Sequence, residues 1–158
     1  HTDLDIDLTT GVRFHPIEIG LSMIYKVVLV TALGAAPWAI LVFEIILNGA
    51  SLFNHSNVYI PEKIDRRVRR VIVTPDMHRV HHSTRVEETN SNFGFSISLW
   101  DYACGTYRKA PVLGQLGMEI GLNEYRDPQR LGFFQLLLLP FHNHNSLRKD
   151  KNTAAQDR

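Results

Sequence analysis

An apolar stretch of 37 residues, positions 17–53, constrains this 158-residue chain more than any other feature. Its only charged side chains are Glu18, Lys26 and Glu44. One straight helix of that length would run roughly 55 Å, well beyond a bilayer core of about 30 Å. The sequence Gly-Ala-Ala-Pro at 34–37 breaks a helix. We therefore expect a membrane hairpin with arms at about 17–33 and 37–53; the alternative is a buried helical pair in a soluble core.

The charges on either side of this stretch predict its orientation. One cation, Arg13, precedes it, the central turn has none, and a basic cluster follows it: Lys63, Arg66, Arg67, Arg69 and Arg70. By the positive-inside rule both ends face the cytoplasm. We therefore expect an integral membrane protein in which His15 and His55 lie at the same cytoplasmic surface.

Residues 61–73 place arginines between apolar residues at helical spacing. Together with Ile60, the residues Ile64, Val68 and Val71 would form one apolar side of such a helix. A basic amphipathic helix directly after a membrane segment is expected at the lipid interface. The formal net charge of +1 gives no general attraction to nucleic acid. We predict an interfacial helix and no nucleic-acid partner.

The rest of the chain suggests one domain over residues 1–141. The segment 131–141 is apolar but too short to span a bilayer, so we expect a second interfacial segment or a packed helix. Residues 142–158 are polar and are expected to be a disordered tail, with His142 and His144 exposed. The single cysteine, Cys104, excludes a disulfide within the chain and any site that needs four cysteines.

The stretch TPDMHRVHHS, residues 74–83, brings three histidines together. Thr74 and Pro75 are typical of a helix start. A helix from there places His78, His81 and His82 at i, i+3 and i+4, on one face. Three imidazoles on one face suit a metal ion, while the simpler interpretation is a polar helix with surface histidines.

Several stretches together resemble the fatty acid hydroxylase and sterol desaturase superfamily, and its bacterial members most closely. They are HTDLDIDLTTGVRFHPIE (1–18), LFNHSNVYIP (52–61), TPDMHRVHHS (74–83) and NSNFGFSISLWDYACGTY (90–107). The resemblance implies an all-α fold: an integral membrane hairpin with cytoplasmic-face helices that carry a histidine-rich metal site. It also implies a non-haem centre of two iron ions.

The resemblance assigns ligand roles to particular histidines. His78, His81 and His82 match an intact motif, and His55 matches the ligand that follows the hairpin. His15 matches a family hallmark. His1 matches the last histidine of an earlier motif, so we expect a chain that lacks the upstream histidines.

Carboxylates near the motifs are candidates to orient the rings, namely Asp76 and Asp101, with Asp3 and Glu18 further candidates; an ordinary cap or surface role is the alternative. Two positions depart from the family: many members have Phe at Cys104, and a second histidine is missing near His55, where Ser51 and Tyr59 stand.

The resemblance implies O2-dependent hydroxylation or desaturation of a C–H bond in a lipid or sterol. Electrons would come from an external donor such as a ferredoxin or cytochrome b5, because the chain has no electron-transfer motif of its own. The expected location is a bacterial inner membrane, or otherwise the endoplasmic reticulum. Two alternatives stay open: a non-catalytic membrane protein with structural zinc, and a soluble helical binding protein.

Overall fold

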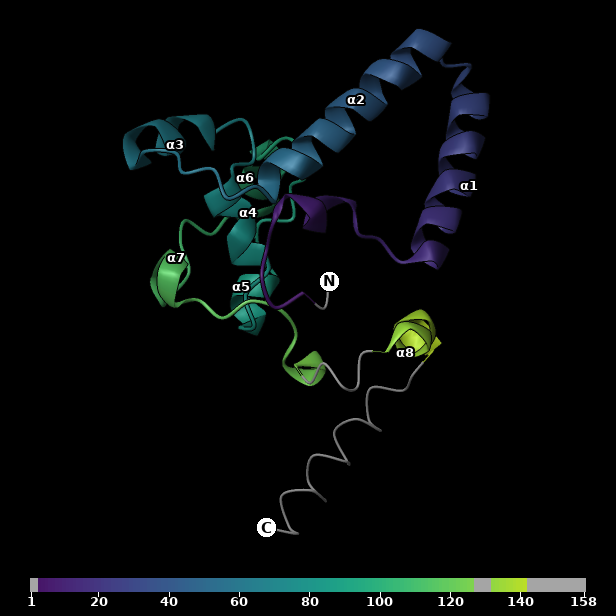
Figure 1. Ribbon diagram of the computed structural model, residues 1–158. Helices are drawn as coiled ribbons and strands as arrows, with labels where there is room; N and C mark the ends of the chain where they lie inside the picture. The colour runs from purple at the N-terminus through teal and green to yellow at the C-terminus, as the bar shows by residue number, and fades with distance from the viewer. Residues whose placement is uncertain (1–2, 127–131, 142–158) are drawn as a thin grey trace.

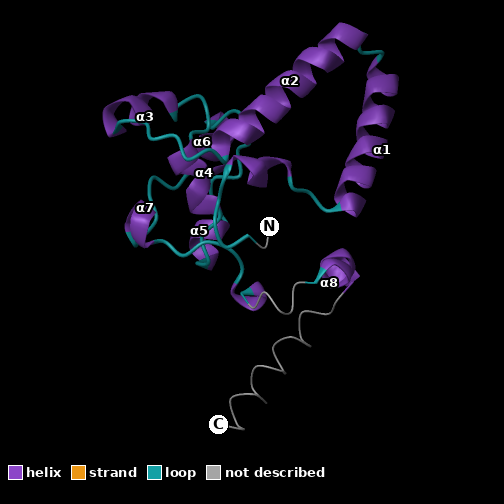
Figure 2. Ribbon diagram, in the orientation of Figure 1, coloured by secondary structure: helices purple, strands orange, loops and turns teal. Residues whose placement is uncertain are grey.

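The computed structural model describes residues 3–126 and 132–141, and the regular elements in them are helical (Figures 1 and 2). In chain order they are η1 (Leu8–Val12), α1 (Pro16–Leu33), α2 (Pro37–Asn54), α3 (Glu62–Val68), α4 (Pro75–His81), α5 (Val86–Thr89), α6 (Leu99–Cys104), α7 (Gly114–Gly117), η2 (Asn123–Tyr125), α8 (Phe133–Leu138) and η4 (Leu139–Phe141). Two isolated antiparallel bridges are the β pairing within these ranges. The expected all-α fold is confirmed. His1, His142, His144 and the predicted tail lie outside the described residues.

Helices α1 and α2 form an open hairpin that projects from the remaining helices (Figure 1). Gly34 ends α1 in the left-handed conformation, at a φ of 62°, which glycine adopts without strain. Pro37 then occupies the first turn of α2, where its missing N–H costs nothing. The predicted break and both arms are confirmed to within one residue at each end.

The hairpin has almost no protein cover among the described residues. Helix α1 buries no residue, and α2 buries only Ser51 and Asn54, close to its C-terminal end. Large apolar side chains are exposed along both arms; Ile24 and Ile45, for example, are 64% and 63% exposed. Both helices are long and apolar enough to cross a membrane. A buried pair in a soluble core would be covered by protein, so that alternative is wrong.

One ion pair joins the two arms. Lys26 Nζ lies 2.7 Å from Glu44 Oε1. Each charge alone would be costly in the hydrocarbon core, and pairing lowers that cost. Lys26 and Glu44 therefore link the two arms of the hairpin.

Helices α3 to α7 form a small head at the end of α2, with α4 at its centre, and α8 lies apart from it (Figure 1). Val73, Met77 and Val80 are fully buried there. Buried polar side chains outnumber buried apolar ones among the described residues, and Asn92 is typical of them. Its amide donates to the carbonyl oxygens of Met77 and Arg108, at 2.8 and 3.0 Å. The head is therefore held by specific hydrogen bonds as much as by apolar burial.

Helix α3 corrects one prediction. The helix ends at Val68 rather than continuing to residue 73, because the following residues pair in extended conformation with residues 96–98. Ile64, predicted on the apolar side that faces the lipid interface, is 53% exposed, whereas Asp65 and Arg69 are buried and form an ion pair. Tertiary contacts of Arg69, whose guanidinium also donates to the carbonyl of Lys109, decide which face is buried.

The hairpin predicts a membrane topology that labelling can test. Single cysteines replacing Val12 and Glu62, in a Cys104→Ser background, should react with a membrane-impermeant reagent from the same side. A cysteine replacing Leu33, beside the turn, should react only from the other side, because α1 and α2 each cross the bilayer once. Labelling of Val12→Cys and Glu62→Cys from opposite sides would contradict the hairpin.

Candidate metal centre

His55 stands at the C-terminal end of α2, where the membrane arm meets the head. It is 3% exposed, and its Nδ1 lies 2.7 Å from the carbonyl oxygen of Ser51, one turn earlier. The short helix η1 packs against this turn, and the Ser51 hydroxyl donates to the carbonyl of Gly11 at 2.5 Å. A carbonyl only accepts, so the neutral ring carries its proton on Nδ1 and presents a lone pair on Nε2.

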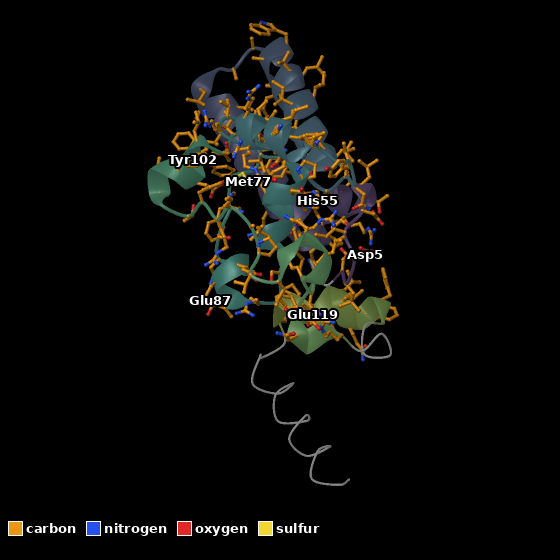
Figure 3. All side chains as sticks on the ribbon, turned by 90° about the vertical axis from the view of Figure 1, so that its left-hand side faces the viewer. Asp5, His55, Met77, Glu87, Tyr102 and Glu119 are labelled. Carbon is orange, nitrogen blue, oxygen red and sulfur yellow. The ribbon has the colours of Figure 1, made fainter. Side chains whose placement is uncertain are left out.

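Helix α4 brings two further imidazoles to the same point. His78 Nε2 lies 3.2 Å from His55 Nε2 and 3.2 Å from His82 Nε2. One nitrogen from each of the three rings lies within 4.8 Å of the others. The predicted helix start at Thr74 and Pro75 is confirmed, although the Thr74 side chain makes no capping bond and His82 falls just past the last turn. His55 lies close beside the buried end of α4 (Figure 3).

This arrangement fits a metal ion better than it fits hydrogen bonding alone. The central Nε2, that of His78, can make a hydrogen bond with only one of its two neighbours, so at the other contact two ring nitrogens face each other without a hydrogen bond and repel. A cation at the point of convergence removes that repulsion. Nitrogen-to-metal bonds of about 2.0–2.1 Å place neighbouring ligand atoms roughly 3 Å apart, close to the separations seen here. Imidazole donors suit zinc, iron, copper and nickel alike.

Burial keeps the rings neutral and ready to bind a cation. Loss of hydration, together with a smaller effect of the neighbouring imidazoles, lowers the pKa of His78 to about 3 and that of His82 to about 2. The pKa of His55 is also lowered, chiefly by burial, while its bond to Ser51 and the charge of Asp3 act in the opposite direction. Metal ligation needs the neutral ring, so these shifts favour binding at neutral pH.

His81 lies beside the three-histidine group rather than in it. Its ring centroid is 5.5 Å from that of His82 and 5.8 Å from that of His78. Its Nδ1 lies 3.1 Å from the carbonyl oxygen of Ser91, which leaves Nε2 with the lone pair. Phe93 packs edge-on against the ring. A carbonyl at Nδ1 and a lone pair on Nε2 are typical of a histidine that binds a metal. His81 thus lies ready for ligation next to the group that the other three histidines form.

The structure places His15 apart from this group. It caps the start of α1, where its Nδ1 accepts from the Ile17 amide at 3.2 Å, and its Nε2 lies 3.2 Å from the Leu137 carbonyl. Both ring nitrogens are thus engaged by the backbone. His1 lies outside the described residues.

Of the two carboxylates that the sequence singled out first, Asp101 holds backbone amides and Asp76 lies away from the rings. Asp101 is buried and accepts from the amides of Phe93 and Gly94 and from the Thr106 hydroxyl, at 2.8, 2.9 and 2.6 Å. It fixes the loop that presents Ser91 and Phe93 to His81. Asp76 lines a pocket away from the three rings.

Sequence reasoning did not single out Gly11 as part of the site or Ser51 as an acceptor for His55. The i, i+4 spacing of Ser51 and His55 is the one signal that pointed to that carbonyl, because a helix end brings such groups together. Gly11 comes close to His55 only through the packing of η1 on α2, which no local pattern indicates. His78 Nδ1, buried without a partner in the described part of the chain, has no explanation in the structure.

Removing one ring of the group should remove the metal. His55→Ala, His78→Ala or His82→Ala should each lower bound metal from near one ion per chain to near zero, because two neutral imidazoles do not complete a site. His15→Ala should retain it, since that ring is engaged elsewhere. Metal content of protein purified in detergent measures this; equal loss in His15→Ala would contradict the assignment.

Substitution of Gly11 should weaken metal binding although Gly11 is not a ligand. A Cβ there would lie 2.7 Å from the Ser51 carbonyl oxygen and 3.0 Å from His55 Nδ1. Gly11→Ala should weaken metal binding and lower stability by about 1–3 kcal/mol, the usual cost of overpacking. Gly49→Ala is the matched control, since a Cβ there meets nothing within 4 Å. Unchanged metal affinity in Gly11→Ala would contradict the packing of η1.

The metal-free protein should lose stability in mild acid. The unfolded chain takes up protons at the ordinary histidine pKa of about 6.5, whereas the folded state resists protonation at His78 and His82. Their contribution is complete above about pH 6.5 and falls as the pH drops below it, by up to about 1.4 kcal/mol per unit for each ring. Thermal unfolding in detergent should show a midpoint that decreases below that pH. A midpoint that is constant down to about pH 5 would contradict neutral burial.

Part of this sequence is similar to known proteins. The family model for fatty acid hydroxylase matches residues 1–106. Ornithine lipid hydroxylase OlsE of Rhizobium tropici is 30% identical over 107 residues, which cover 66% of this chain and 30% of that protein. The chain thus spans about 30% of the length of this curated relative. No solved structure matches the chain. With its three-histidine group inside the matched range, the chain belongs to the fatty acid hydroxylase family.

Proposed function

We propose that this chain carries a metal centre at which a membrane lipid is hydroxylated with O2. The observation that carries the proposal is the convergence of three neutral Nε2 atoms at the base of a membrane hairpin. Membership of the fatty acid hydroxylase family and the similarity to a lipid hydroxylase support it. The sterol and desaturase alternatives have no such support here.

His55, His78 and His82 would hold one iron ion, and His81 would offer its Nε2 to a second. When bound, the iron pair supplies the oxidising power that activates O2 and breaks a C–H bond. The protein's own contribution is to keep the rings neutral by burial and to fix their tautomers through the carbonyls of Ser51 and Ser91. His1 and His15 remain predicted ligands without a place in the described site.

The position of the centre supports a substrate that enters from the bilayer. His55 directly follows the last residue of α2, so the site lies at the end of a membrane arm. A lipid chain in the bilayer reaches this depth without leaving the membrane. Electrons would come from an external donor such as a ferredoxin or cytochrome b5. By the charge pattern the site faces the cytoplasm.

Oxygen incorporation tests the proposal. Membranes that contain the protein at full length, supplied with isotopically heavy O2 and reduced ferredoxin, should yield a membrane lipid that has gained one labelled oxygen atom. His78→Ala should abolish the product, and Arg67→Gln, an exposed charge outside the site, should not. Tightly bound zinc with no labelled lipid would favour the alternative, a structural metal site in a non-catalytic protein.

A further inference from the structure

A pocket of about 440 Å³ lies beside α3 and the start of α4. Its walls come from α3, from the residues just before it and from loops around residues 107–110, with Asp76 and Gln115 closing one side. None of the clustered histidines lines it. In the view of Figure 3, Met77 of α4 lies between Tyr102, in the pocket wall, and His55. The pocket is therefore a second polar site, separate from the imidazoles.

The lining carries charges of both signs. Asp65 and Arg69 form a buried ion pair, which leaves three cations, Arg66, Arg70 and Lys109, and two carboxylates, Glu62 and Asp76. Within the described residues these five side chains have no hydrogen bond or ion pair with another residue. Charged groups gathered around a cavity without mutual pairing suit a ligand that carries both a negative group and N–H donors.

The walls also contain polar atoms whose hydrogen bonds the protein leaves unmade. Asp65 Oδ1, Arg69 Nε and Gln115 Oε1 are buried without a partner among the described residues, and all three residues line this pocket. Two of these atoms accept and one donates. Buried polar groups are nearly always satisfied in folded proteins, so this group calls for a polar occupant with donors and acceptors of its own.

The surroundings indicate where such an occupant comes from. Beside the pocket, Tyr59 is 82% exposed, and Ile64 stands on the outer face of α3. These residues follow the membrane arm α2 within ten positions, and α3 lies alongside its lower half in Figure 1. Apolar side chains next to exposed arginines are typical of a segment at the lipid headgroup level. Lipid headgroups are thus within reach of the pocket.

We propose that this pocket binds a zwitterionic headgroup: a phosphate or carboxylate held by Arg66, Arg70 and Lys109, beside an ammonium held by Glu62 and Asp76. The same chemistry is offered by a membrane lipid and by the free headgroup molecule. The proposal goes beyond the hydroxylation chemistry, since it concerns a site that no metal ligand lines.

Titration of the detergent-purified chain with short-chain phosphatidylethanolamine, short-chain phosphatidylglycerol and free phosphoethanolamine tests it. Phosphatidylethanolamine should bind about tenfold more tightly than phosphatidylglycerol, which lacks the ammonium. The double variant Arg66→Gln/Arg70→Gln should weaken phosphatidylethanolamine binding by about tenfold or more, since charge-assisted hydrogen bonds are lost. The matched control is Lys63→Gln/Arg67→Gln, which removes the same charge from two positions of α3 that lie outside the pocket.

Each outcome decides the question. Equal affinity for free phosphoethanolamine and the lipid would support the pocket with a free molecule as its occupant, and preference for the lipid would support the headgroup. Equal weakening in both double variants would show general charge attraction and overturn the proposal, as would an absence of binding or a preference for phosphatidylglycerol. Retained metal binding by the Arg66→Gln/Arg70→Gln protein verifies that it is folded.

Discussion

Three imidazoles that meet at their Nε2 atoms tie the membrane hairpin to the head. His55 comes from the end of α2, and His78 and His82 come from α4. Burial keeps each ring in its neutral, singly protonated form, so without a cation one of the close contacts between ring nitrogens has no hydrogen bond. A bound metal would therefore stabilise the joint between hairpin and head as well as provide chemistry, because binding free energy adds to folding free energy.

The supports of this joint are backbone atoms and small residues rather than charged side chains. The carbonyls of Ser51 and Ser91 fix ring tautomers, and Gly11 lets η1 approach His55. Gly94 likewise allows a close approach, in the loop beside His81, because a Cβ there would lie 2.6 Å from Asp101 Oδ2. Carbonyls raise the basicity of a ring without adding a formal charge near the metal. A metal ion bound by these neutral rings would thus keep its positive charge.

The sequence was sufficient for those parts of the fold that local rules decide. Gly34 and Pro37 specify the turn by themselves, and Thr74 with Pro75 specifies the start of α4. The common face of His78, His81 and His82 follows from helical spacing. Each of these predictions rests on residues within a few positions of one another, where backbone geometry leaves few choices.

The parts that the sequence did not specify depend on contacts between distant segments. Helix α3 turns its Asp65–Arg69 pair inward because Arg69 reaches Lys109, forty residues later, a contact that the periodicity of the apolar residues does not indicate. His81 separates from its two neighbours because residue 91 supplies its acceptor. Asp101, a candidate to orient a ring, holds backbone amides of the loop beside His81. Sequence patterns thus identify the residues of the site, whereas the contacts that those residues make depend on tertiary packing.

The hairpin and its surroundings together set the depth of the site. Helix α8, whose Phe134 is 75% exposed, is joined to the start of α1 through the contact between His15 and the Leu137 carbonyl. Helix α3 exposes Ile64 on another side of the head. Apolar groups therefore surround the base of the hairpin where His55 ends α2, and a bilayer would cover them at that level. A lipid bound as proposed would place its polar end against the charged walls beside α3 and keep its chain in the hydrocarbon, next to the apolar residues at the base of the hairpin.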